Sequence, residues 1–342
     1  MTAPGLVATA QALVAGDKGL LAMDESVPTC HLRFAALGIA QTVEARRAWR
    51  ELLATAPGLS EGIGGAILHD ETLRQRTRSG VPFAAVLAEA GIAPGIKVDS
   101  GAKDLAGHPG EKVTEGLDGL RARLAEYAGL GARFAKWRAV IRLGNRLPSR
   151  AGLVANAHAL ARYAALCQEI GLVPIVEPEV LMDGDHSLAR CADVTDEVLR
   201  VVFSQLREQG VMLEGLLLKP NMVLPGSDSA SAETVDAVAD ATVRCLLRAV
   251  PAAVPGVCFL SGGQPAALAS ARLNAMNARY GTRLPWPLTF SFARALQQPA
   301  LEIWKGEDAN IAAAQQTLIH RVRCNRAARR GGYDAASDAP RA

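Results

Sequence analysis

The sequence predicts an α/β fold, a single-domain (β/α)8 barrel, and three observations point to it. Short apolar segments recur eight times along the 342 residues, and stretches of helical character separate them. Alternating strands and helices pair their strands in parallel through right-handed crossovers. Eight such units fit a chain of this length. No break in composition interrupts the series, so one barrel is preferred over the two domains that length alone would allow.

The strand candidates are short apolar runs, and glycine or proline stands at one end of most of them. In chain order they cover residues 19–25, 63–69, 94–99, 132–138, 172–179, 214–221, 256–262 and 285–291. Helical periodicity of 3.6 residues is clearest over 151–170, 232–249 and 310–329. A polar loop is expected at 225–231, after the sixth strand.

The competing fold is a doubly wound open sheet. That fold would place a Gly-x-Gly-x-x-Gly turn after an early strand. The glycines at 62, 64 and 65 have a different spacing and stand at the beginning of their strand. The sequence therefore predicts a TIM barrel over residues 1–330, followed by a short, flexible C-terminal tail at 331–342 that is rich in small and polar residues.

Composition excludes several classes of protein. Hydrophobic residues make up 49% of the chain and charged residues 21%, which excludes a disordered or collagen-like chain. Aromatic residues are only 4%, so the core is expected to be aliphatic. The net charge of +3 gives no footprint for nucleic acid, and the arginine-rich stretch 321–330 is expected to be a solvated helix end.

The cysteine and histidine pattern predicts neither a disulfide framework nor a metal site. Six cysteines are scattered without a Cys-x-x-Cys pair, and the six histidines form no His-x-x-x-His pair. No signal peptide or membrane-spanning run is visible. We therefore expect a cytoplasmic protein that does not bind a membrane.

Polar side chains stand near the carboxyl ends of most strand candidates, where a buried strand should be apolar. They are Asp24, Lys97, Lys136, Arg138, Glu177, Glu179, Lys219, Ser261, Ser291 and the nearby Arg294. Alternate residues of a strand share one face, so the pairs 136/138 and 177/179 point the same way. A structural ion pair could explain any one of these charges, but so many costly charges at one end of a barrel favour an active site.

The residue types at this end indicate the chemistry. Several cations imply an anionic, phosphorylated substrate. Crowded lysines are expected to lower one another's pKa, which frees an amine to attack a carbonyl. Neighbouring carboxylates can serve as acid and base, and the backbone at Gly262 and Gly263 can bind a phosphate. The residues therefore predict Schiff-base lysine chemistry on a phosphorylated carbonyl compound, with no metal and no cofactor.

At this point the motifs resemble the class I (Schiff-base) fructose-bisphosphate aldolases of glycolysis. The matching segments include 18–26 (KGLLAMDES), 134–138 (FAKWR), 173–179 (VPIVEPE), 216–222 (LLLKPNM) and 259–264 (FLSGGQ). The resemblance runs from about residue 10 to residue 333. It implies a lyase that reversibly cleaves fructose 1,6-bisphosphate to dihydroxyacetone phosphate and glyceraldehyde 3-phosphate in glycolysis and gluconeogenesis. Homotetramers are common in the family.

The resemblance also implies roles for individual residues. Lys219 corresponds to the Schiff-base lysine, and Glu177 to the acid that helps to dehydrate the carbinolamine. Lys136 matches an essential second lysine, Asp24 the base for the C4 hydroxyl, and Glu179 a residue that tunes the charges. Contacts to the C1 phosphate are implied for Ser261, Gly262 and Arg294, with Ser291 beside them. Contacts to the other phosphate and to the substrate chain are implied for Ser26, Arg33, Lys97 and Arg138.

Two alternatives remain at this stage. The first is an aldolase that prefers another phosphorylated ketose, such as the 1-monophosphate, because the segment 27–32 departs from the family pattern. The other is a non-catalytic binding protein that has kept the barrel.

Overall fold

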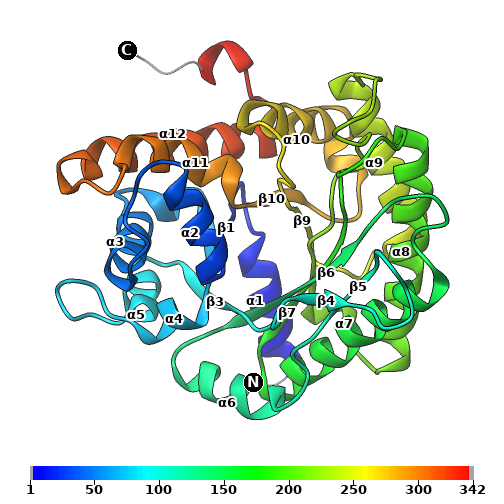
Figure 1. The fold of residues 1–342 in the computed structure, drawn as a ribbon, viewed down its shortest axis with the longest axis horizontal. Coiled ribbons are helices and arrows are strands. Elements are labelled where there is room, and N and C mark those ends of the chain that lie inside the picture. The colour runs from blue at the N-terminus through cyan, green and yellow to red at the C-terminus, as the bar shows by residue number, and fades with distance from the viewer. Residues whose placement is uncertain (1–2, 339–342) are drawn as a thin grey trace.

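The computed structural model describes residues 3–338 and has a closed barrel of eight strands at its centre (Figure 1). Around the barrel the strands follow the order β1 (Gly19–Met23), β10 (Leu288–Phe292), β9 (Val257–Phe259), β8 (Leu217–Leu218), β7 (Val173–Val180), β6 (Phe134–Ile141), β3 (Ala93–Lys97) and β2 (Ile63–Leu68), which pairs with β1 again. Neighbouring strands are parallel throughout. The predicted fold class is confirmed.

Most helices cover the outside of the barrel, whereas the first one packs at its amino-terminal end. The helices are α1 (Ala3–Leu13), α2 (Val27–Ala35), α3 (Val43–Ala54), α4 (Asp70–Arg74), α5 (Phe83–Glu89), α6 (Leu120–Gly129), α7 (Arg150–Ile170), α8 (Leu188–Glu208), α9 (Val235–Ala249), α10 (Ala266–Tyr280), α11 (Arg294–Trp304) and α12 (Ile311–Arg329). The predicted helices at 151–170, 232–249 and 310–329 correspond to α7, α9 and α12. Ser149 and Thr234 accept backbone N–H bonds at the first turns of α7 and α9, which fixes where these helices begin.

Two local features differ from the sequence prediction. The strand expected at 214–221 is reduced to the two residues of β8, because a short 3-10 turn precedes it and Pro220 has no N–H to donate. A small antiparallel hairpin of β4 (Ala102–Asp104) and β5 (Lys112–Thr114) was not predicted. Because β4 is fully exposed and charged, it has no apolar alternation that could have marked it as a strand.

The interior of the barrel is filled at its amino-terminal end by α1 and a few large side chains. Leu6 and Leu13 of α1 belong to the same buried cluster as Phe134 of β6. The ring of Phe134 lies so close to Gly95 of β3 that a Cβ at this glycine would be 2.2 Å from it. Glycine at position 95 therefore makes room for an aromatic ring inside the barrel.

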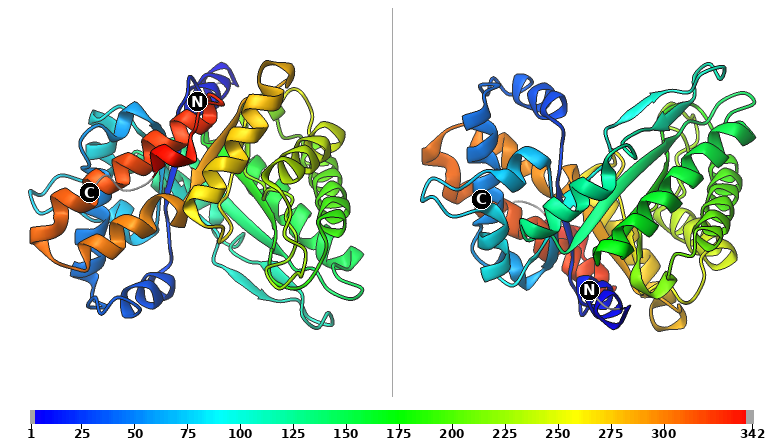
Figure 2. Two further views of the ribbon diagram at one scale, coloured as in Figure 1. Left: turned by 90° about the horizontal axis from the view of Figure 1, so that it is seen from above. Right: turned by 90° about the horizontal axis from the view of Figure 1, so that it is seen from below.

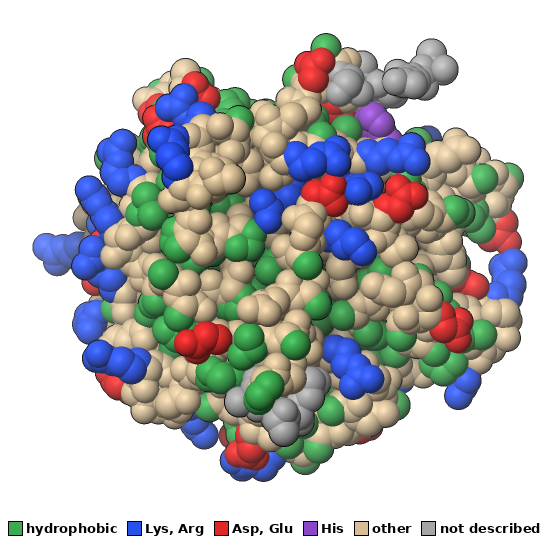
Figure 3. All heavy atoms as spheres, turned by 180° about the vertical axis from the view of Figure 1, so that it is seen from behind, with side chains coloured by type: hydrophobic (Ala, Val, Ile, Leu, Met, Phe, Trp, Pro, Cys, Tyr) green, Lys and Arg blue, Asp and Glu red, His purple; other side chains and the backbone are tan. Residues whose placement is uncertain are grey.

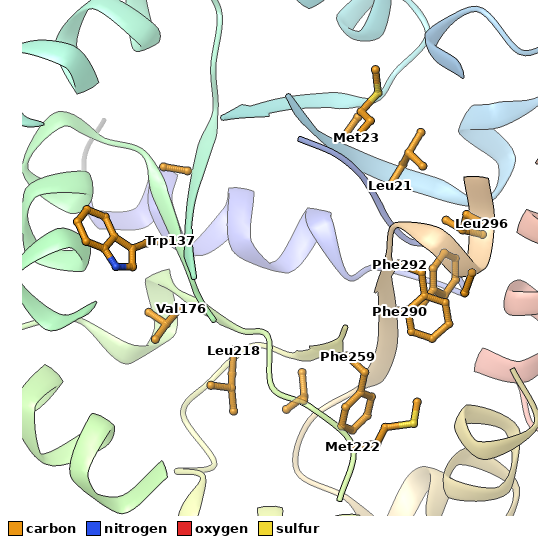
Figure 4. Packing of buried hydrophobic residues seen from close by; sticks show 14 of the residues in the cluster. Leu21, Met23, Trp137, Val176, Leu218, Met222, Phe259, Phe290, Phe292 and Leu296 are labelled. Carbon is orange, nitrogen blue, oxygen red and sulfur yellow. The ribbon is translucent and has the colours of Figure 1, made fainter. Parts of the chain in front are cut away.

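Alternation along the strands separates the outer core from the barrel interior. On β6, Trp137 is completely buried in the layer between strands and helices, whereas Lys136 on the other face lines the interior (Figure 4). Likewise, Val176 of β7 packs outward and Glu177 points inward. This period of two is what gathers the polar side chains at the carboxyl end of the barrel.

The C-terminal helix and the segment after it pack on the barrel. The helix α12 lies against α10 and α11 (Figure 2). The chain then continues to a 3-10 turn at Ala335–Asp338, where Tyr333 is buried and Asp338 forms an ion pair with Arg321. Within the segment for which a flexible tail is expected, a buried arginine thus provides a counter-ion for Asp338. The remaining residues of that predicted tail, 339–342, lie outside the described part of the chain.

The surface carries mixed charge. Positive and negative side chains are interspersed on the face shown in Figure 3. Within the predicted solvated stretch at 321–330, Arg326 and Arg330 form ion pairs with Asp17, but Arg321 is buried, which corrects the expectation for this residue. Among residues 3–338, no helix combines the length and the apolar character that a membrane span requires.

Candidate active site

An open cavity of about 460 Å³ lies at the carboxyl ends of the barrel strands. Every residue to which the resemblance gives a role lines it: Asp24, Ser26, Arg33, Lys97, Lys136, Arg138, Glu177, Glu179, Lys219, Ser261, Gly262, Ser291 and Arg294. Most of these residues come from strands or strand ends, whereas Arg33 lies on α2 and Arg294 begins α11. The tertiary structure therefore brings together a set that is spread over most of the chain.

Two lysines and two carboxylates form a continuous cluster in this cavity. The Nζ of Lys136 lies 2.8 Å from Oδ2 of Asp24 and 3.0 Å from Oε2 of Glu177. The Nζ of Lys219 lies 3.2 Å from the other oxygen, Oε1, of Glu177. All four side chains are nearly inaccessible to solvent. Glu177 thus bridges the two lysines, and a proton can pass between Lys219 and Glu177.

The carboxylates of this cluster are ionised. Burial raises the pKa of Asp24, but the charges of Lys136, Lys219 and Lys97 outweigh it and hold that pKa far below its ordinary value. The pKa of Glu177 is lowered for the same reason, since Lys136 and Lys219 offset the cost of burial. Both side chains are therefore proton acceptors in the free protein.

The pKa of Lys136 corrects one expectation from the sequence. Crowding with other lysines was expected to lower a lysine pKa, but Lys136 lies between two carboxylates. Burial lowers its pKa, and the charges of Asp24 and Glu177 more than compensate, so that the net shift is strongly upward. Lys136 therefore keeps its positive charge in the free protein. Lys219 touches only one of these carboxylates.

One side of the cavity is suited to bind a phosphate. The turn after β9 contains Gly262 and Gly263, whose φ angles are +57° and +90°. A Cβ at Gly263 would be 2.9 Å from a guanidinium nitrogen of Arg294, so this backbone lies directly against that cation. The buried hydroxyl of Ser291 on β10 lines the cavity and has no hydrogen-bond partner, so it is free to meet a ligand.

Three further cations line the cavity from β3, β6 and α2. Lys97 is 3.3 Å from Asp99, and Nε of Arg138 donates to Glu179. These strands lie across the barrel from β9 and β10. The cavity therefore has a cationic region at each of two opposite sides, which suits a substrate that carries a charge at both ends.

Arg33 on α2 is held by a residue that the sequence analysis missed. Its Nη1 donates to Glu25 at 2.6 Å, and Nη2 donates to Gln298 of α11 at 3.3 Å. The second oxygen of Glu25 accepts from the buried Arg50 of α3. Glu25 follows Asp24 directly and also lines the cavity, but its two arginine partners are decided only by the fold.

Two other residues of the cavity were also missed. Thr29 lines it beside Ser26, and the two hydroxyl oxygens are 3.0 Å apart. Asp99 accepts a hydrogen bond from the backbone N–H of Arg138 in addition to its contact with Lys97. Asp99 had a signal in the sequence, since it is a charged residue at the end of the strand candidate 94–99.

Comparison with known proteins identifies the family. The family of class I fructose-bisphosphate aldolases, the glycolytic type, matches residues 5–342. The chain is 57% identical over 326 residues to a probable fructose-bisphosphate aldolase class 1 of Xylella fastidiosa strain Temecula1, covering 95% of this chain and 97% of the relative.

This chain belongs to the class I fructose-bisphosphate aldolases.

More distant aldolases match over a similar length. A cytosolic fructose-bisphosphate aldolase of Arabidopsis thaliana is 51% identical over 328 residues, covering 96% of this chain and 83% of the plant protein. The solved structure of the Plasmodium falciparum aldolase superimposes with a TM-score of 0.95 at 47% identity, covering 97% of this chain and 95% of that one. The predicted family is therefore confirmed, and the fold is that of a solved member of the family.

Proposed function

We propose that this aldolase cleaves fructose 1,6-bisphosphate to dihydroxyacetone phosphate and glyceraldehyde 3-phosphate through a Schiff base on Lys219. The single observation that carries the assignment of residues is the buried cluster in which Glu177 touches both lysines and Lys136 touches Asp24. The reaction runs in both directions and thus serves glycolysis and gluconeogenesis.

The charges of the cluster suggest how the imine forms. Glu177 is ionised and its Oε1 lies 3.2 Å from Nζ of Lys219, so a proton transferred from Lys219 to this carboxylate leaves a neutral amine. The amine attacks the C2 carbonyl, and Glu177 then returns a proton to the departing hydroxyl, which leaves as water. The ammonium of Lys136 stabilises negative charge that develops on the oxygen.

Cleavage then uses the iminium as an electron acceptor. Asp24 is ionised, so it takes the proton of the C4 hydroxyl. The C3–C4 bond breaks, its electron pair moves into the C=N⁺ bond to form an enamine, and the aldehyde product leaves. Protonation of the enamine at C3 and hydrolysis of the imine release dihydroxyacetone phosphate and restore Lys219. Glu179, paired with Arg138, tunes the charge around this cluster.

The two cationic regions of the cavity support a doubly phosphorylated substrate. Ser261, Gly262, Ser291 and Arg294 bind the C1 phosphate. The other phosphate and the chain of the sugar lie against Ser26, Arg33, Lys97 and Arg138. Leu32 lines the cavity, is 75% exposed and adds no charge there. The cations across the cavity nevertheless favour the bisphosphate over the 1-monophosphate as the substrate.

Assembly and location follow from the family. A homotetramer in the cytoplasm is proposed, and the relatives named cytosolic in plants support the location.

The test is reductive trapping of the imine. With dihydroxyacetone phosphate present, borohydride should reduce the imine to a stable secondary amine, and peptide mass spectrometry should place this adduct on Lys219. The variant Lys219→Ala should give no adduct, and EDTA should not inhibit cleavage. A wild-type protein that is folded and forms no adduct would overturn the proposal.

A further inference from the structure

Arg321 of α12 is buried, with only 4% of its surface exposed. Its guanidinium donates in several directions. Nε donates to the carbonyl of Ala295 at 3.3 Å, and Nη2 donates to the carbonyl of Ala266 at 2.9 Å and to the hydroxyl of Ser270 at 2.7 Å. Arg321 therefore connects α11, which contains Ala295, to α10, which begins at Ala266.

These two attachment points adjoin the two parts of the C1-phosphate subsite. Ala295 follows Arg294 directly in the chain. Ala266 comes two residues after Gln264, which closes the turn at 261–263 because its backbone N–H and its side-chain Nε2 both donate to the carbonyl of Ser261 at 3.0 Å. The guanidinium of Arg321 thus fixes the two segments that present the turn and Arg294.

The relative position of these two segments matters because they touch at the subsite. An added Cβ at Gly263 would meet the guanidinium of Arg294 at 2.9 Å, so the turn and this cation are in close contact. A phosphate bound by both needs their donors at a fixed separation, and a small displacement of either segment weakens binding.

The C-terminal segment holds Arg321 in place. Asp338 accepts from Nη1 of Arg321 and, at 2.5 Å, from the hydroxyl of Tyr333. Cys324 and His320 are each 3.2 Å from the same carboxylate. Burial raises the pKa of Asp338, but the hydrogen bonds from Arg321 and Tyr333 outweigh it and lower the pKa, so the carboxylate stays charged.

His320, Cys324 and Asp338 are also residue types that bind metal ions, and their donor atoms lie within 4.8 Å of one another. The guanidinium of Arg321 already contacts the same oxygen of Asp338. A second cation at this oxygen would be repelled, so we assign Asp338 to Arg321 and not to a metal ion.

We propose that Arg321 is a positioning residue for the C1-phosphate subsite, and that Asp338 holds it in that role. Arg321 acts through the carbonyls of Ala266 and Ala295 and touches no substrate. The inference rests on the proposed function, because it concerns the subsite where the phosphate of dihydroxyacetone phosphate binds.

The experiment compares two ligands in the trapping reaction on Lys219. Dihydroxyacetone phosphate carries the phosphate, and dihydroxyacetone lacks it. In Arg321→Gln, the concentration of dihydroxyacetone phosphate that gives half-maximal trapping should rise about tenfold, because the subsite donors are displaced. The half-maximal concentration of dihydroxyacetone should stay within about twofold of wild type, because this ligand does not use the subsite.

Matched variants separate positioning from general damage. Arg323→Gln, an exposed arginine on the same helix, should behave as wild type with both ligands. Arg321→Lys keeps the charge but cannot donate in all of these directions, so it should restore part of the affinity. Asp338→Asn leaves Arg321 in place without its counter-ion. In this variant the half-maximal concentration of dihydroxyacetone phosphate should also rise, by a smaller factor than in Arg321→Gln. Asp338→Asn therefore tests the proposal if Arg321→Gln does not fold.

The outcomes are distinguishable. If wild type forms no adduct, the proposed function fails. If wild type forms the adduct and folded Arg321→Gln has an unchanged half-maximal concentration for dihydroxyacetone phosphate, the positioning role is wrong. An equal rise for both ligands would also overturn it, since that pattern means damage to the whole active site.

Discussion

Lys136 and Asp24 form an ion pair with 2.8 Å between Nζ and Oδ2, although their strands, β6 and β1, are separated in the barrel by β2 and β3. The pair therefore spans the interior of the barrel. It places a permanent ammonium beside the carboxylate that we assign as the base for cleavage.

Replacement of this ammonium should damage both chemistry and stability. In Lys136→Met, the buried carboxylates Asp24 and Glu177 lose their common partner. We expect kcat to fall by about 10²-fold or more and the free energy of unfolding to fall by about 3–5 kcal/mol. Steady-state kinetics and urea unfolding measure these two effects. The control is Lys103→Met, which replaces an exposed lysine of β4 and should change neither kcat nor the free energy of unfolding. An unaltered kcat in Lys136→Met would contradict the assignment.

Stability should decrease at acid pH. The pKa values of Asp24, Glu25 and Glu177 are all lower in the folded protein than the ordinary values. Groups with a lowered pKa stabilise the fold above the pKa of the unfolded chain, about 4, and lose this contribution as the pH falls below it. Urea unfolding from pH 7 to pH 3 should therefore show a free energy that decreases below about pH 4 to 5. A curve that rises toward pH 3 would contradict this expectation, and Asp24→Asn should reduce the acid-dependent loss.

The glycine beneath Phe134 should not tolerate a methyl group. A Cβ at Gly95 would lie 2.2 Å from the ring of Phe134 inside the barrel. Gly95→Ala should therefore lower the free energy of unfolding by about 1–3 kcal/mol. The matched control is Gly129→Ala in α6, where a Cβ has open space and the backbone is helical; it should stabilise the protein by about 0.5–1 kcal/mol. Equal effects of the two substitutions would refute the packing argument.

Glu25 should affect binding of the phosphate that lies against Arg33 more than binding of the C1 phosphate. Its carboxylate holds Arg33 at the cavity and pairs with the buried Arg50. In Glu25→Gln, we expect KM for fructose 1,6-bisphosphate to rise about tenfold because Arg33 loses its orientation, with a smaller change for fructose 1-phosphate. The ratio of the two KM values is the measurement. Glu44→Gln removes an exposed acid that pairs with Arg47 and should leave the ratio unchanged.

The secondary structure was predictable wherever the pattern was regular and the segment buried. Strands such as β2 and β7 are buried along nearly their whole length, so their apolar composition marked them. The exposed hairpin of β4 and β5 lacks such a pattern and was missed. The prediction for β8 was too long, since the assigned strand ends at Leu218, before Pro220, although the segment remains buried.

The cavity residues were predictable as a set but not as pairs. A charge in an otherwise apolar strand end is conspicuous in the sequence, and all of the selected residues line one cavity. Which charge faces which was not predictable. The upward shift in the pKa of Lys136 depends on its position between Asp24 and Glu177, whereas crowding with other lysines alone would lower that pKa.

By itself, the sequence determined the barrel, the family and the end of the barrel at which the selected polar residues gather. Each of these depends on local apolar pattern, strand alternation or contiguous motifs, which are properties of neighbouring residues. Only the tertiary structure decided the partners of Lys136, the contact between Arg33 and Glu25, and the anchoring of Arg321 by Asp338. Coulomb interactions and hydrogen bonds act over a few ångströms in space, and the distance along the chain does not reveal which charges the fold brings within that range.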